Sequence, residues 1–269
     1  MKLGISSYTL TWSVGVPGYP PPLQPIDACG LLTIAREEQV ALVQIADNLP
    51  LQAKSDNELL QLRRRAEEIN IELEIGTRGT DPDHLRRYLQ IARLLNSKLV
   101  RTLITTSDLS VAARDLAEIE PEFAHEGVLL AIENHGLHTT NQLIGLFQQL
   151  NSAHIGCCLD TVNSFGALED PQRVIDALTP YLVNLHIKDF DIQRIDHQMG
   201  FSLLGTPAGA GRLDLNYLFG RIAEYGKTPT AILELWTPYC GTTENTIRKE
   251  HAWMKESLSN LRKYPLHYK

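Results

Sequence analysis

Four ionisable residues stand at or near the ends of four successive apolar runs, and their chemical types suit a metal ion. They are Glu133, Asp160, His186 and Glu234. Carboxylates that converge without a cation repel one another, and burying them unpaired costs stability. A divalent metal would resolve this, and three oxygen ligands with one nitrogen suit Mn, Mg or Co, while Zn is possible. A lone polar residue at a strand end is commonly a helix cap, so the prediction rests on the repeated placement.

Such a metal would support enediolate chemistry. A cation that holds the hydroxyl and carbonyl oxygens of an α-hydroxy ketone acidifies the C–H bond between them and stabilises the enediolate. Two carboxylates on opposite sides of the substrate can then remove a proton and return it elsewhere. The residues therefore predict an enzyme that acts on a small carbohydrate-like molecule.

Several side chains near these runs are candidates for binding a substrate. His135 lies two residues beyond Glu133 on the same strand face, where it can bond a substrate hydroxyl or a ligand carboxylate. His138 is better explained as a loop or capping histidine. Trp12 and Trp236 follow strand ends and could form aromatic walls for a sugar, or simply pack at the rim.

Four basic residues lie in or beside the segment 189–212: Lys188, Arg194, His197 and Arg212. Together they could clamp a substrate carboxylate or phosphate, because Arg offers a bidentate fork and Lys a point charge. The alternative is that they pair with the aspartates of the same segment. Arg101 lies within another apolar run, so an inward-facing charge there must reach the site or pair with a carboxylate such as Glu74.

Eight short apolar or β-branched runs alternate with segments whose apolar residues recur at helical spacing. The runs cover residues 2–7, 41–46, 71–76, 99–105, 128–134, 155–161, 182–188 and 230–236. The helical segments include residues 57–69, 83–95, 111–123, 141–150, 215–225 and 246–261. Alternation of this kind requires parallel strands with right-handed crossovers, and eight units close into a barrel. We predict an α/β fold, a single-domain (β/α)8 TIM barrel over residues 1–269.

Two connections are longer than a barrel needs. They cover residues 8–25 and 189–212, and both follow the carboxyl ends of strands. Barrel enzymes place their sites at that end, so both are candidate lids or substrate walls.

Composition narrows the possible partners and compartment. The 269 residues are 43% hydrophobic and 21% charged, with a net charge of −7, which argues against nucleic-acid binding. The cysteines, Cys29, Cys157, Cys158 and Cys240, show no disulfide pattern and are read as free thiols. With no apolar run of ~18 residues, we expect a cytoplasmic protein without a membrane partner. A homo-oligomer is compatible with the sequence, although no segment marks an interface.

The run endings also resemble a known superfamily. The segments IENH, CLDT, NLHIKD and ILELW, with GTPAGAGRLD between the last two, resemble the xylose-isomerase-like TIM barrels of the sugar phosphate isomerase/epimerase family. The match in order spans nearly the whole chain, and its second half is specific. The resemblance implies one metal on Glu133, Asp160, His186 and Glu234, with the two glutamates as acid and base.

One departure from the family pattern keeps two reactions open. Ketose 3-epimerases typically carry a histidine shortly after the strand-six Asp, whereas this chain reads Asp160-Thr-Val-Asn163. Asn163, a candidate substrate-binding residue, also replaces a zinc ligand of the endonuclease IV type. The leading hypothesis is an isomerase or epimerase of a keto-sugar, and the alternative is a metal-dependent decarboxylase or dehydratase of a 3-oxo sugar acid. A non-catalytic sugar-binding barrel is a third reading.

Overall fold

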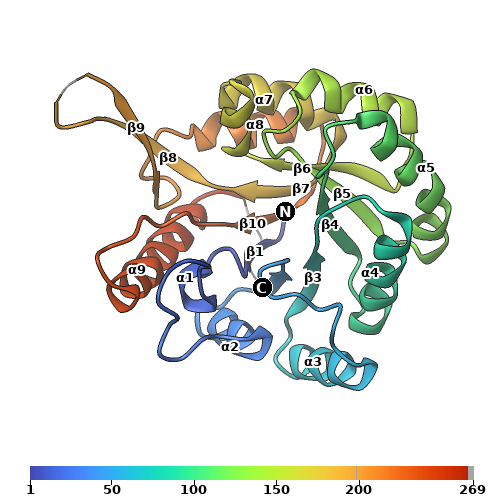
Figure 1. The fold of residues 1–269 in the computed structure, drawn as a ribbon, viewed down its shortest axis with the longest axis horizontal. Coiled ribbons are helices and arrows are strands. Elements are labelled where there is room, and N and C mark those ends of the chain that lie inside the picture. The colour runs from blue at the N-terminus through green and yellow to red at the C-terminus, as the bar shows by residue number, and fades with distance from the viewer. Residues whose placement is uncertain (198, 266–269) are drawn as a thin grey trace.

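A computed structural model describes residues 1–197 and 199–265 and contains the predicted barrel. Eight parallel strands close in the order β1-β10-β7-β6-β5-β4-β3-β2, with helices around them (Figure 1). The barrel strands are β1 (Leu3–Ser6), β2 (Leu42–Ile45), β3 (Glu72–Gly76), β4 (Leu99–Leu103), β5 (Leu129–Glu133), β6 (Ile155–Asp160), β7 (Leu182–Ile187) and β10 (Thr230–Leu233). The predicted (β/α)8 TIM barrel is confirmed.

The helices cover the outside of the barrel. They are α1 (Thr11–Val14), α2 (Ala28–Glu37), α3 (Asp56–Glu68), α4 (Pro82–Leu95), α5 (Leu109–Glu126), α6 (Thr140–Leu150), α7 (Pro171–Leu178), α8 (Leu215–Glu224) and α9 (Thr243–Leu261). The six predicted helical segments are present, and the structure adds α1, α2 and α7. Ser55 and Glu58 form a capping box at the start of α3, which explains where that helix begins.

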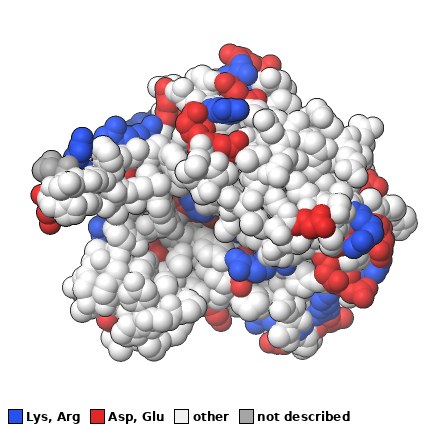
Figure 2. All heavy atoms as spheres, turned by 45° about the horizontal axis from the view of Figure 1, so that its top comes forward, with Lys and Arg blue, Asp and Glu red and all other residues white. Residues whose placement is uncertain are grey.

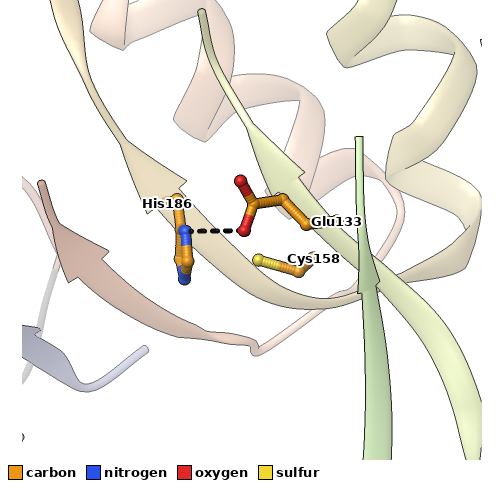
Figure 3. Close-up of side chains that lie close together, drawn as sticks. All are labelled: Glu133, Cys158 and His186. Carbon is orange, nitrogen blue, oxygen red and sulfur yellow. Dashed lines mark ion pairs between the residues drawn. The ribbon is translucent and has the colours of Figure 1, made fainter. Parts of the chain in front are cut away.

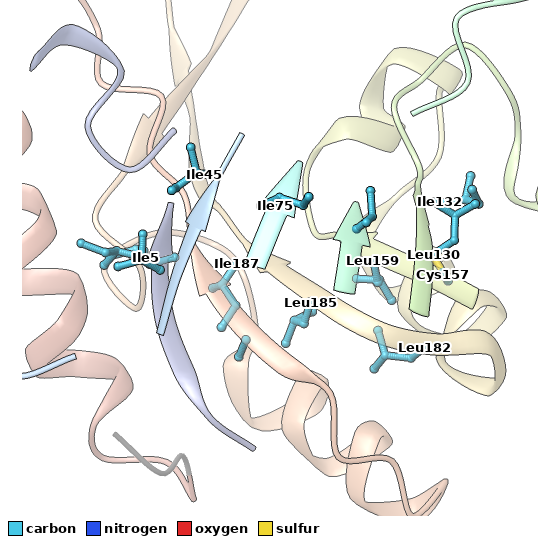
Figure 4. Packing of buried hydrophobic residues seen from close by; sticks show 14 of the residues in the cluster. Ile5, Ile45, Ile75, Leu130, Ile132, Cys157, Leu159, Leu182, Leu185 and Ile187 are labelled. Carbon is cyan, nitrogen blue, oxygen red and sulfur yellow. The ribbon is translucent and has the colours of Figure 1, made fainter. Parts of the chain in front are cut away.

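Residues of the strands alternate between the helices outside and the barrel interior. Aliphatic side chains such as Ile5, Ile75 and Ile187 belong to the large buried cluster (Figure 4). A small separate apolar cluster contains Leu99, Ala131 and Cys158, which belong to the alternate positions. Other buried residues at these alternate positions are polar: Gln44, Glu74, Arg101, Asn184 and His186. The interior of this barrel is therefore built to hold ionisable groups.

The segment 189–212, expected as a loop, contains a β-hairpin. Strands β8 (Asp189–Arg194) and β9 (Phe201–Thr206) pair antiparallel, and the hairpin projects from the barrel (Figure 1). Alternating apolar residues support it, since Ile192 stands opposite Leu203 and both are partly exposed. In the part of the chain that the structure describes, no helix has the length and apolarity needed to cross a membrane.

The first long connection is fastened to the last helix by a buried carboxylate. Glu250 accepts hydrogen bonds from the backbone N–H of Trp12 (2.8 Å) and of Ser13 (3.1 Å), and from the Ser13 hydroxyl (2.9 Å). Burial raises the pKa of Glu250 to about 7 despite these donors. The carboxylate thus fixes the backbone that carries Trp12 to the barrel mouth.

The raised pKa of Glu250 gives a stability prediction. The native state holds this proton above pH 4.5, where the unfolded chain releases it, so native stability falls as pH rises towards 7. The loss amounts to up to about 3 kcal/mol at order of magnitude. We expect Glu250→Gln to flatten the decline of unfolding free energy between pH 5 and 8, measured by urea denaturation. An unchanged slope in the variant would show that Glu250 does not titrate in this range.

Candidate metal centre

The four predicted residues meet at the carboxyl ends of neighbouring strands. Glu133 and Asp160 end β5 and β6, His186 lies in β7, and Glu234 directly follows β10; all four are buried. Asp160 and His186 are register partners, so the strand order itself places them side by side. Ligand atoms of Asp160, His186 and Glu234 lie within 4.8 Å of one another. The parallel register of the strands therefore brings these four residues together, although they are far apart in the sequence.

Glu133 belongs to a second, overlapping group with Cys158 and His186 (Figure 3). The Glu133 Oε2 atom lies 3.5 Å from His186 Nδ1. Burial raises the pKa of the Cys158 thiol well above its usual value, and the thiol lies 3.1 Å from the side-chain oxygen of Asn184. Cys158 therefore stays a neutral thiol under this arrangement, and the carboxylate group is the better site for a hard divalent cation.

The chain itself supplies two cations beside these carboxylates, in addition to any metal. Arg101 Nε lies 2.7 Å from Glu133 Oε2. Lys188 Nζ lies 2.9 Å from both Asp160 Oδ2 and Glu234 Oε2. Burial opposes the charge of both basic groups, but the surrounding carboxylates outweigh it and raise their pKa values. Charge repulsion alone is therefore not evidence for a metal.

The two glutamates respond oppositely to this environment. Burial raises the pKa of Glu133 to about 7, although Arg101 acts against the shift. Burial also opposes ionisation of Glu234, but nearby basic groups, Lys188 among them, outweigh it and lower its pKa to about 2. Two carboxyl groups whose environments separate their pKa values are suited to opposite roles in proton transfer.

Unsatisfied atoms supply an independent test of whether the residues fit a metal. Burial lowers the pKa of His186 to about 4, so its imidazole is neutral near pH 7. Its Nδ1 atom lies 3.3 Å from Glu234 Oε1 and 3.5 Å from Glu133 Oε2. Glu133 Oε2 and Asp160 Oδ2 already face Arg101 and Lys188, whereas His186 Nδ1 is buried, makes no hydrogen bond and faces two carboxylate oxygens. A neutral imidazole nitrogen that faces carboxylates is satisfied by a cation, so the residues fit a metal ion.

Of the predicted substrate-binding residues, Asn163 and Lys188 reach this cluster. Asn163 Nδ2 donates to Glu133 Oε1 at 2.7 Å. His135 is exposed just beyond β5. His138 is buried with Nε2 2.9 Å from the Thr106 carbonyl oxygen, as expected for a structural histidine.

The other three predicted basic residues lie away from the cluster, on or beside the hairpin. Arg212 Nε donates to Asp191 at 2.7 Å, which is the pairing foreseen as the alternative. The Arg194 guanidinium stacks 4.3 Å above the Phe201 ring, and His197 is exposed. In this arrangement the three side chains do not join Lys188, because Arg194 and His197 lie on the hairpin and Arg212 pairs with Asp191 at its base; the four-residue clamp stays a prediction.

The GTPAGAGRLD segment, residues 205–214 at the end of the hairpin, has a structural role that the sequence analysis did not predict. The buried Asp189 carboxylate accepts hydrogen bonds from the backbone N–H groups of Gly209 (2.8 Å), Gly211 (3.0 Å) and Leu213 (2.9 Å). A Cβ atom on Gly211 would lie 2.3 Å from Asp189 Oδ1, so glycine is required there. This contact fixes the loop next to Lys188.

Both predicted tryptophans line a cavity of about 310 Å³ at the barrel mouth. Its other described lining residues are Tyr8, Thr11, Val16, Lys188, Leu235 and Thr237. Trp12 Nε1 donates to the Thr237 carbonyl (2.8 Å), and Trp236 Nε1 donates to the Asp189 carbonyl (2.9 Å). Lys188 is the charged member of this lining, so the cavity is apolar with one cation that also contacts the acidic cluster. Figure 2 shows basic atoms inside a hollow beside the hairpin.

Arg101 turns to the site and pairs with Glu133 rather than with Glu74. It also contacts Asp47 Oδ1 at 3.1 Å, and Asp47 Oδ2 in turn lies 2.9 Å from Arg78 Nε. Asp47 and Arg78 were not expected near the site. No spacing could have shown them, since both lie in connections between strands.

The fold and site define a (β/α)8 barrel with an acidic cluster at its carboxyl end. The chain belongs to the xylose isomerase-like TIM-barrel family, whose model matches residues 43–262. The 3-oxo-isoapionate decarboxylase of Pectobacterium atrosepticum is 35% identical over 97% of this chain and 95% of its own length.

Solved structures confirm the fold. D-psicose 3-epimerase from Clostridium cellulolyticum, solved with D-tagatose, is 16% identical, with a TM-score of 0.72 and 98% of each chain covered. A xylose isomerase-like barrel from Mycobacterium smegmatis, solved with magnesium, is 14% identical, with a TM-score of 0.69 and 97% of each chain covered.

Proposed function

We propose that the protein is a divalent metal-dependent decarboxylase of a 3-oxo sugar acid, the lyase alternative that the sequence left open. Charge at the site carries the proposal. Three carboxylates, Glu133, Asp160 and Glu234, face two basic side chains, Arg101 and Lys188. A divalent ion would turn the resulting single negative charge into a positive one. A positive, largely apolar pocket favours an anionic substrate over a neutral ketose.

Glu133, Asp160, His186 and Glu234 would hold the metal, which we propose to be Mn or Mg. Three of them already have ligand atoms within 4.8 Å of one another, and Glu133 lies beside them. When bound, the ion polarises the 3-oxo group and stabilises negative charge on its oxygen. The magnesium in the Mycobacterium smegmatis structure supports a metal of this kind.

The remaining steps follow from the side chains. Lys188 lies at the cavity wall, where its ammonium can bind an oxygen of the anionic substrate. Cleavage of the C1–C2 bond releases CO2, and its electron pair moves to the C3 oxygen to give an enediolate. Glu133 ends β5 beside the cluster and is the group that we propose delivers the proton that C2 then requires. Trp12 and Trp236 keep water from this carbon.

The curated relative supports the same reaction class, because the 3-oxo-isoapionate decarboxylase covers nearly the whole chain. A second function, epimerisation of a keto-sugar, is favoured by the opposed pKa shifts of Glu133 and Glu234, which fit proton removal and return. Asn163 donates a hydrogen bond to Glu133, the proposed acid. It is also the residue at which this chain departs from the ketose 3-epimerase pattern.

The test is proton NMR in D2O of the Mg-loaded protein with 3-oxo-isoapionate, related 3-oxo sugar acids and a panel of ketoses, combined with CO2 detection. We expect release of one CO2 per acid consumed and one solvent deuteron at C2 of the product. Deuterium exchange with all carbons retained would support epimerisation instead. Turnover of neither class by the metal-loaded protein would contradict both.

Removal of metal provides a separate prediction. After treatment with EDTA, we expect turnover to fall by at least about 100-fold, because the enediolate loses its main electrostatic stabilisation. Addition of Mn or Mg, but not Ca, should restore it, since Ca prefers more oxygen ligands than this cluster offers. Full activity after exhaustive chelation would contradict a metal requirement.

A further inference from the structure

A chain of buried hydrogen bonds runs from His186 into the barrel interior, through Gln44 to Asn184, Glu74 and Thr230. These residues lie on β2, β3, β7 and β10 and the first four are at most 5% exposed. We infer that Gln44 is a positioning residue that fixes the His186 proton on Nε2, so that Nδ1 is the atom presented to the metal. The inference rests on the proposed metal centre, but the proton position can be measured without it.

The direction of the Gln44 amide follows from its other partners. Gln44 Nε2 lies 3.1 Å from Glu74 Oε2 and 3.2 Å from Asn184 Oδ1. Burial raises the pKa of Glu74 to about 7, so above that pH the group is a carboxylate whose oxygens only accept, and the NH2 group of Gln44 must face it. The Gln44 oxygen then faces His186, with Oε1 2.8 Å from Nε2. An acceptor at this position requires a donor, and therefore places the proton on Nε2.

The orientation of Asn184 is fixed in the same way. Its Nδ2 atom lies 3.3 Å from Glu74 Oε2 and 2.8 Å from Thr230 Oγ1, so both amide hydrogens have acceptors. Its oxygen accepts from Gln44 and from the Cys158 thiol, at 3.2 and 3.1 Å. Reversal of the Gln44 amide would set its oxygen against a carboxylate oxygen in a buried site. Glu74 thus anchors the direction of the whole chain.

The consequence lies at the other side of the imidazole ring. A neutral imidazole carries one proton, so a proton on Nε2 leaves a lone pair on Nδ1. That atom faces Glu234 Oε1 and Glu133 Oε2, and it makes no hydrogen bond. A hydrogen bond that holds the tautomer and orientation of a ligand histidine raises its metal affinity, and loss of such a partner typically costs 10–100-fold.

The test replaces Gln44 with methionine, which has a similar length and no amide. The proton position is read from the 15N shifts of His186 in metal-free protein labelled at histidine, assigned with His186→Asn. Manganese affinity is measured by titration. We expect wild type to show the Nε2–H form, and Gln44→Met to mix the two forms and bind Mn about 10–100-fold more weakly.

Thr102→Val is the matched control, because it removes a buried hydrogen bond, 2.7 Å to the Gly79 carbonyl, that touches no member of the chain. It should leave both readouts unchanged. Should Gln44→Met fail to fold, Glu74→Gln carries the test. The NH2 group of the glutamine introduced at position 74 can face the Gln44 oxygen, so the Gln44 amide can reverse. The Nδ1–H form of His186 should then appear.

The outcomes separate the inference from the proposed function. A wild type that binds no Mn but holds the Nε2–H form would remove the metal centre and leave the assigned proton position standing. A wild type that binds Mn, with Gln44→Met equal to it in affinity and proton position, would overturn the role of Gln44 alone. An equal loss in Thr102→Val would also overturn it, since the effect would then follow from the loss of any buried hydrogen bond of a barrel strand.

Discussion

Glutamine at position 133 or 234 should lower the turnover of the metal-loaded protein by on the order of 1,000-fold. Each change keeps the size of the side chain and removes an ionisable group. Glu133→Gln removes the acid whose pKa is raised to about 7, and Glu234→Gln removes a carboxylate that contacts Lys188 and lies close to His186. Steady-state CO2 release measures turnover and Mn titration measures metal affinity; both variants should also weaken Mn binding, since each removes a proposed ligand.

The matched control is Glu250→Gln, which alters another buried glutamate whose hydrogen-bond partners are Trp12 and Ser13 rather than members of the cluster. It should keep turnover within a few-fold of wild type at pH 5 to 6. If either variant at 133 or 234 retained turnover within about tenfold of wild type, the acid and base roles proposed for these residues would be wrong. A non-catalytic barrel would show ligand binding that both variants leave intact.

Lys188→Met should separate metal binding from turnover. The Lys188 ammonium competes with a metal for Asp160 and Glu234, to each of which it lies at 2.9 Å. Its loss should therefore maintain or strengthen Mn binding, while turnover falls by on the order of 100-fold or more because the anionic substrate loses its partner. Without metal, the variant should melt at a lower temperature than wild type, because buried carboxylates lose their counter-ion. Added Mn should restore much of that loss.

Two further variants sharpen the Lys188 experiment. Lys188→Arg keeps the charge and should recover part of the turnover. Arg212→Met removes a hairpin cation that pairs with Asp191 on the surface, and it should leave turnover within a few-fold of wild type. A parallel fall of Mn affinity and turnover in Lys188→Met would contradict the proposal, since it would give Lys188 a purely structural role.

The charge balance of the cluster explains why the glutamate variants and the Lys188 variants should differ in their effect on Mn binding. Arg101 and Lys188 neutralise two of the three carboxylates, so the cluster can stay buried in the metal-free chain. Arg101 is held by both Glu133 and Asp47, whereas Lys188 also lines the cavity with Trp12 and Trp236. Lys188 is thus the basic residue that a substrate can reach, whereas Arg101 remains paired with Glu133 and Asp47.

The barrel and the strand-end positions of its main ionisable residues were predictable from periodicity and residue placement along the chain. Strand and helix periodicity are local properties, and parallel strands place all their carboxyl ends at one edge. Glu133, Asp160, His186 and Glu234 could therefore be assigned to one site from their places in the apolar runs. The hairpin at 189–206 escaped this reasoning, because a short ribbon outside the barrel obeys no barrel constraint.

Which side chains contact one another follows from the three-dimensional arrangement and could not be predicted from residue types. Lys188 and Arg212 looked equivalent in the sequence, yet one lies in the acidic cluster and the other pairs with Asp191 at the surface. Gln44 and Asn184 are separated by 140 residues and meet because the closed barrel faces β2 towards β7 across its interior. Side-chain direction, distance and burial set the pKa values and hydrogen-bond partners of this site, and none of these is a property of residue type or spacing.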